Sequence, residues 1–115
     1  MHTNATIAIS TDGLTATLTL GGETMSVVIA DPPTGAKFSQ LPATRYASDP
    51  PLPAQPAGED ADQDNGDTTV LAIELPGGTY SLQVVFNPQW AGSKASDFVT
   101  PPKVAIGDWS LTSHD

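Results

Sequence analysis

The sequence contains no cysteine, which excludes disulfide bonds and thiolate chemistry. It also has little positive charge, because 4 Lys and Arg stand against 13 Asp and Glu and give a formal net charge of −9. A chain this acidic is expected to bind neither the phosphate backbone of nucleic acids nor an anionic membrane. The longest aliphatic run, Val27 to Ala30, is too short to cross a bilayer. No basic segment followed by an apolar one opens the chain, so we expect no signal peptide.

Histidine is scarce as well, which argues against catalysis. His2 and His114 are the two histidines, and each lies within two residues of a chain end, where backbone is usually frayed. Carboxylates gather in one loop, where nothing would raise the pKa of one above another. No glycine-rich phosphate loop joins a strand to a helix. We therefore expect no catalytic residue in this chain.

The residues that are present favour strands. Threonine recurs, and 10 Gly and 11 Pro disfavour helices. Apolar and polar residues alternate with period two, which is typical of antiparallel sheets with one covered face. The alternating segments are 5–10, 15–20, 24–30, 69–75 and 79–87. A shorter strand is expected over 36–41, and one or two more within 103–111.

Tight-turn dipeptides, Asp12-Gly13 and Gly21-Gly22, separate the first three strands and predict a meander. About seven or eight short strands at this spacing predict an all-β fold, an antiparallel β-sandwich formed by residues 1–115 as a single domain. Tyr80 and Phe86 share the face of segment 79–87 that should point inward. The expected core is Ile7, Ile9, Leu18, Leu20, Val27, Ile29, Phe38, Leu71, Ile73, Leu82, Val84 and Phe86.

One segment, 48–67, does not fit a core. It is rich in proline, has no large apolar side chain beyond Leu52, and carries five acidic residues after Gly58. We interpret it as a long, flexible, Pro-rich acidic loop within the domain.

Within this loop, carboxylates at nearly every second position could converge on a calcium ion, with Asp60, Asp62, Asp64 and Asp67 as candidate ligands. The helix-flanked calcium loop requires Gly at its sixth position and Glu at its twelfth, where this chain has Asn65 and Leu71. The sequence therefore favours a solvated acidic loop tip over a calcium site, and no cofactor is expected.

Three aromatic residues are candidates for stacking on sugar rings, because they lie in loops or at strand ends: Tyr46, Trp90 and Trp109. The alternative is that both tryptophans cap the ends of the sandwich core, since tryptophan is mostly buried.

The order of motifs adds a family resemblance over residues 14–90. A strand leads into Pro33-Thr34-Gly35-Ala36-Lys37-Phe38, a Pro-rich excursion follows, and two further strands end at Val84-Val85-Phe86-Asn87-Pro88. This arrangement resembles the small C-terminal β domain of heparinase II/III-like polysaccharide lyases, in which a strand runs into a P-x-G-A-x-F turn and a later strand ends near V-x-F-x-P.

The resemblance implies a non-catalytic module of a larger enzyme that cleaves acidic polysaccharides by β-elimination in the periplasm or outside the cell. The catalytic Tyr, His and Asn of that family lie on its other domains, so none is carried over to this chain. A domain of charge −9 should repel a polyanionic glycan, so the implied partners are the neighbouring domains of the parent chain.

Two alternatives stay open. One is a stand-alone carbohydrate-binding module, with the three aromatic residues as platform and calcium in the acidic loop. The other is a structural or assembly protein, in which exposed edge strands pair with copies of the same chain.

Overall fold

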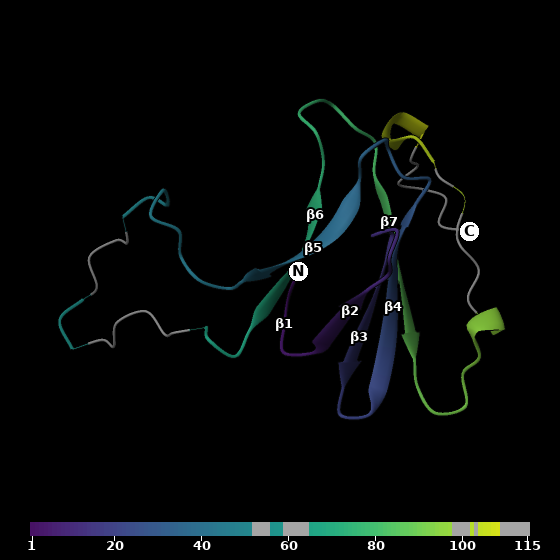
Figure 1. Ribbon diagram of the computed structural model, residues 1–115, viewed down its shortest axis with the longest axis horizontal. Coiled ribbons are helices and arrows are strands. Elements are labelled where there is room, and N and C mark those ends of the chain that lie inside the picture. Colours follow the sequence, from purple (N-terminus) through teal and green to yellow (C-terminus); the bar gives the residue numbers. More distant parts are fainter. Residues whose placement is uncertain (52–55, 59–64, 98–101, 103, 109–115) are drawn as a thin grey trace.

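A computed structural model describes residues 1–51, 56–58, 65–97, 102 and 104–108. Within these residues it has seven strands in two antiparallel sheets, two short 3₁₀ turns and no α-helix (Figure 1). The four-stranded sheet has the order β2 (Thr6–Ile9), β3 (Thr15–Leu20), β4 (Glu23–Ala30) and β7 (Gln83–Gln89). The three-stranded sheet has the order β1 (His2–Thr3), β6 (Thr69–Glu74) and β5 (Lys37–Pro42). The 3₁₀ turns are η1 (Ala95–Asp97) and η2 (Ile106–Asp108). The expected all-β sandwich fold is confirmed.

The predicted meander is present, and its turns explain why. Gly21 and Gly22 have φ values of 61° and 88°, which glycine adopts without strain, so β3 reverses directly into β4. Gly13 (φ 74°) forms the earlier turn, and a side chain there would lie 2.9 Å from the Cβ of Lys37. The Gly13 carbonyl accepts a 2.7 Å hydrogen bond from the Phe38 amide, which joins this turn to β5 of the other sheet.

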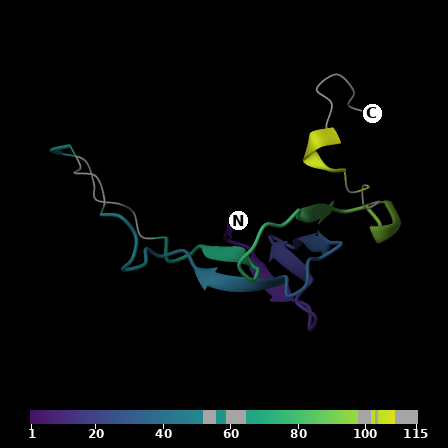
Figure 2. The ribbon, with the colours of Figure 1, turned by 90° about the horizontal axis from the view of Figure 1, so that it is seen from above.

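The core forms where the two sheets face each other (Figure 2). Its buried members come from the inner faces of both sheets and include Val27, which is 1 % exposed. Burial of one such aliphatic side chain stabilises the fold by roughly 1.5–3 kcal/mol. The buried cluster consists of Ala5, Ala16, Leu18, Val27, Ile29, Ala36, Phe38 and Leu71, with Ile7, Ile9, Ile73 and Val84 packed partly buried against it.

Three expected core residues are exposed, and that part of the prediction is wrong. Leu20 is 62 % exposed, Leu82 is 38 % exposed and Phe86 is 49 % exposed. Tyr80, also expected inside, is 39 % exposed. Phe86 does lie on the inner face, because it pairs directly with Val27 in the β4–β7 register.

Phe86 stays exposed because the two sheets have different widths. At one edge β5 lies against β2, and the Gln40 side-chain amide donates a 3.0 Å hydrogen bond to the Ile7 carbonyl. At the other edge the three-stranded sheet ends at β1, which has only two residues. Among the described residues, no further strand stands opposite β7. Leu82 and Tyr80 lie in the connection that crosses from β6 to β7, not in a strand.

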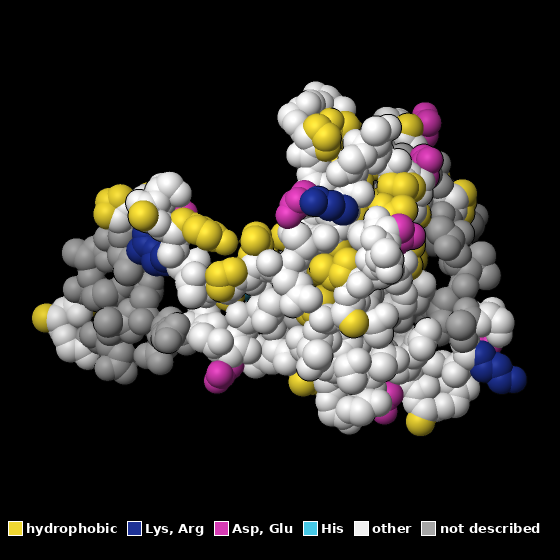
Figure 3. Space-filling model, viewed as in Figure 1, with side chains coloured by type: hydrophobic (Ala, Val, Ile, Leu, Met, Phe, Trp, Pro, Cys, Tyr) yellow, Lys and Arg dark blue, Asp and Glu magenta, His cyan; other side chains and the backbone are white. Residues whose placement is uncertain are grey.

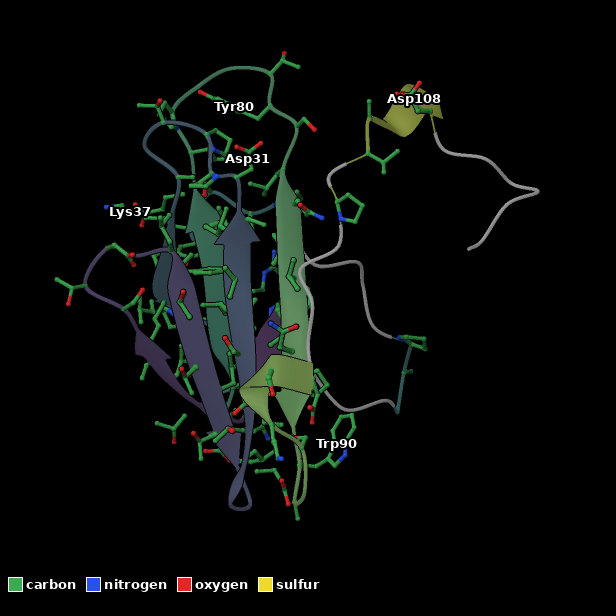
Figure 4. All side chains as sticks on the ribbon, turned by 90° about the vertical axis from the view of Figure 1, so that its right-hand side faces the viewer. Asp31, Lys37, Tyr80, Trp90 and Asp108 are labelled. Atoms are coloured by element: carbon green, nitrogen blue, oxygen red, sulfur yellow. The ribbon has the colours of Figure 1, made fainter. Side chains whose placement is uncertain are left out.

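β7 also departs from the simple alternation in a second way. Its strand begins at Gln83 rather than at residue 79, and Val85 on the outer face is buried to 9 % exposure. Among the described residues after β7, η1 lies on this outer side of the sheet (Figures 1 and 4). β3 therefore has one buried face and one solvent-exposed face, as predicted, whereas β7 also has a buried residue on its outer face.

Two exposed carboxylates support the strand connections. The Asp12 carboxylate accepts hydrogen bonds from the Ser10 hydroxyl (2.6 Å) and the Leu14 amide (3.0 Å), and these two donors lower its pKa. Glu74 pairs across the strands with Lys37 (Nζ to Oε2, 3.1 Å), and the hydrogen bond from Lys37 lowers the pKa of Glu74.

Two leucines on one face of β3 test where the core ends. We expect Leu18→Ala to lower the free energy of unfolding by about 3 kcal/mol, because the side chain is buried and a cavity remains. Leu20→Ala should cost less than about 1 kcal/mol, because Leu20 is largely exposed. Urea unfolding of both variants measures the difference, and equal losses would contradict the placement of Leu20 outside the core.

The Asp12 turn predicts a pH dependence. Because the folded-state pKa of Asp12 is lowered, its carboxylate stabilises the fold above the unfolded value of about 4, and that contribution disappears as the pH falls through the folded value. Asp12→Asn should therefore be less stable than the parent sequence at pH 7, with a smaller difference at pH 3. Urea midpoints at both pH values check this, with exposed Asp67→Asn as the matched control. A constant deficit at both pH values would contradict the prediction.

Candidate functional site

A hollow lies where the β5–β6 connection leaves the sheets. The described parts of that connection project away from both sheets (Figures 1 and 2), and the hollow lies between them and the sheet (Figure 3). Its volume is about 810 Å³. We call it the loop-base hollow, and its walls are His2, Leu41, Pro42, Ala43, Thr44, Arg45, Tyr46, Asp49, Asn65 and Val70.

A reciprocal turn holds the outer wall of the loop-base hollow. The Asp49 carboxylate accepts a 2.7 Å hydrogen bond from the Tyr46 amide, and the Asp49 amide donates a 3.0 Å hydrogen bond to the Tyr46 carbonyl. The Arg45 guanidinium donates to the Pro50 carbonyl and closes the same turn. These contacts keep the Tyr46 side chain, 51 % exposed, on the wall of the hollow.

The inner wall includes His2, which the sequence suggested would be frayed. That expectation is wrong. His2 lies in β1 opposite Val70, and the amino group of Met1 donates a 2.8 Å hydrogen bond to the Leu71 carbonyl. The amide of Leu71 returns a 2.8 Å bond to the Met1 carbonyl, so the start of the chain is fixed to the sheet.

The hollow therefore combines an aromatic ring, a guanidinium, a carboxylate and an imidazole on one concave surface. Such a surface suits a small polar ligand with an apolar face. It offers no built catalytic pair, because neither Tyr46 nor Asp49 is buried.

Tyr46 and Trp90, two of the three aromatic residues predicted to stack on sugar rings, do not lie at one site. Trp90, 58 % exposed, lies just past the end of β7 (Figure 4) and is not part of the loop-base hollow that contains Tyr46. Its exposure is contrary to the alternative in which it caps the core. Trp109 lies outside the described residues.

The candidate calcium ligands Asp60, Asp62 and Asp64 also lie outside the described residues. Asp67 is exposed, in a turn closed by a 2.8 Å hydrogen bond from the Thr68 amide to the Asn65 carbonyl. In the part of the chain that the structure describes, no three His, Asp or Glu side chains group as a metal site would require.

A second surface was missed by the sequence pattern, which assigned Leu20 and Phe86 to the core. We call it the open face, and it consists of Leu20, Met25, Phe86 and Pro88, with Trp90 at its end. Met25 and Pro88 are half-buried and oppose each other in the β4–β7 register, and Leu18 and Phe86 lie beside them on the same side of the sheet. The exposure of this surface follows from the unequal widths of the two sheets, and no local sequence pattern encodes those widths.

Within the described residues, no helix has the length and apolarity needed to cross a membrane. Comparison of the chain with known protein families, with curated proteins and with solved structures found no match.

Proposed function

We propose that this chain is a non-catalytic β-sandwich module that packs, through its open face, against a neighbouring domain of a larger protein. The observation that carries the proposal is Phe86, which lies on the inner face of the sheet opposite no described strand and remains 49 % exposed. An inner-face phenylalanine of a complete sandwich would be covered.

The energetics agree with a surface that is covered in a larger assembly. Phe86, Trp90 and Leu20 each leave about half or more of their surface exposed. Removing apolar surface from water is worth about 25 cal/mol per Å², so covering these three side chains is worth several kcal/mol before ordering costs. Several exposed apolar side chains on one face of a sheet mark an interaction surface.

The family resemblance supplies the expected partner. A heparinase II/III-like polysaccharide lyase would provide the neighbouring domains, and its acid–base chemistry would reside there. The charge of −9 agrees with a supporting role, because this module would repel an acidic polysaccharide at close range.

The test begins with the gene. If the reading frame continues upstream of the Met1 codon, the parent protein and the isolated module should each be made with Phe86→Ser. We expect the melting temperature of the parent to fall by several degrees more than that of the module, because the parent loses an interdomain contact. Leu41→Ser, a similar change at a 39 % exposed residue of the other sheet, is the matched control.

Two results would contradict the proposal. One is a stop codon and ribosome-binding site directly upstream of the Met1 codon. The other is a parent protein in which Phe86→Ser and Leu41→Ser have the same effect.

A second candidate function, carbohydrate binding, is favoured by the loop-base hollow. Tyr46 supplies an exposed ring for a sugar face, while Arg45, Asp49 and Asn65 supply donors and acceptors beside it.

Calorimetric titration with neutral and acidic oligosaccharides tests this candidate. We expect saturable binding that Tyr46→Ala abolishes and Trp90→Ala leaves unchanged, because Trp90 is outside the hollow. Titrations without heat for every sugar, or equal loss in both variants, would contradict a binding site at the hollow.

A further inference from the structure

The edge of β7 away from β4 has a defined set of backbone groups that find no partner among the described residues. The Ile29 amide donates to the Leu14 carbonyl (3.0 Å), so the backbone groups of Ile29 point toward β3. Backbone groups alternate in direction along a strand, so Val28 and Ser26 point toward β7 and pair with Val85 and Asn87.

It follows that Val84, Phe86 and Pro88 point their backbone groups away from β4, along this edge. Among the described residues, none hydrogen-bonds to the outward amides of Val84 and Phe86. The side chains of these same residues lie on the inner face. The edge thus offers two amide donors, three carbonyl acceptors and the exposed ring of Phe86.

This edge lacks the charge that usually protects exposed strands. Natural edge strands carry lysine, other charges or bulges that discourage pairing with further chains. Here residues 75–93, which contain β7 and both of its flanking connections, include no Asp, Glu, Lys or Arg, and no other uncharged stretch of the sequence is as long. Pro88 removes a single outward donor at one end of the edge. By contrast, β5 carries Lys37 and lies against β2.

We propose that two copies of this chain associate by antiparallel pairing of their β7 edges, which joins two four-stranded sheets into one. A two-fold axis at Phe86 places Phe86 opposite the partner's Phe86 and Val84 opposite the partner's Pro88. The two Phe86 residues exchange two hydrogen bonds, and each Val84 amide donates to the carbonyl of Pro88 of the partner subunit. Pro88 has no backbone N–H and therefore leaves no unpaired donor in this register. Both outward N–H groups of each edge, those of Val84 and Phe86, find an acceptor.

Charge favours a second copy as the occupant. Two chains of −9 repel each other at most surfaces, and β7 with its flanks is the longest stretch of the sequence that brings no like-charged side chains to such a contact. The facing phenylalanine rings also cover part of each other's exposed surface. The pairing uses the backbone edge and does not depend on the neighbouring domain proposed above.

The first experiment is sedimentation of the 115-residue chain from about 1 µM to about 1 mM, the range in which weak dimers form. We expect the weight-average mass to rise from 11.9 kDa toward twice that value. Because two like-charged chains must approach, association should strengthen as salt is raised. A monomer at every concentration and salt level would overturn the proposal while leaving the proposed packing of the open face untouched.

Paired variants locate the contact. Phe86→Glu should abolish association, because it sets two carboxylates opposite each other, whereas Leu20→Glu adds the same charge on an interior strand and should retain it. Val84→Pro removes one outward amide that makes no intramolecular bond and should weaken association at least tenfold. Circular dichroism establishes that each variant is folded. If Phe86→Glu and Leu20→Glu associate equally, pairing through β7 is wrong.

Cross-linking tests the register without weakening the edge. The chain has no native cysteine, and directly opposed residues of a hydrogen-bonded antiparallel pair have Cα atoms about 5.5 Å apart, within disulfide range. Mild oxidation should convert Phe86→Cys to covalent dimer in a large fraction of molecules, and Leu20→Cys in few. Equal cross-linking of the two variants would exclude the two-fold register at Phe86.

Discussion

The structure depends on β4, which is the only strand of the four-stranded sheet that connects the β2–β3 meander to β7. Its inner residues, Val27 and Ile29, are 1 % and 2 % exposed and meet the facing sheet, while its two edges fix the registers of β3 and β7. A slip of one residue would turn this apolar set toward solvent, so the burial of Val27 and Ile29 specifies both pairings at once.

The two sheets are unequal, and both proposed surfaces of β7 arise from that difference. One edge of the sandwich is closed, because β5 lies against β2 and the Gly13 turn bonds to Phe38. The other edge of the three-stranded sheet is the two-residue β1, and among the described residues no strand of that sheet covers Phe86 of β7. Its inner side chains form the open face and its outward backbone forms a pairing edge. The two surfaces share the Phe86 ring but differ in chemistry, because one is apolar and the other is a row of backbone donors and acceptors.

The loop-base hollow arises in a different way. The β5–β6 connection leaves the sheets, and local hydrogen bonds of Tyr46, Asp49 and Arg45 shape its first turn. The sequence pattern predicts Tyr46 as a candidate ring but does not indicate His2, because residues next to a chain end are usually frayed. A hydrogen-bond pair between Met1 and Leu71, 70 residues apart, fixes that end in place.

Alternation and turn glycines are local properties, so the sequence alone predicts the all-β class, the meander and five of the strands to within about two residues at most ends. It also determined which face of β3 and β4 is apolar. Which of these apolar faces are covered depends on how the two sheets pack. Phe86 and Val84 share one face of β7, yet Val84 packs against the core and Phe86 is half exposed, because coverage depends on the number and length of strands in the facing sheet. That number is a long-range property, which period-two patterning along a single strand does not encode.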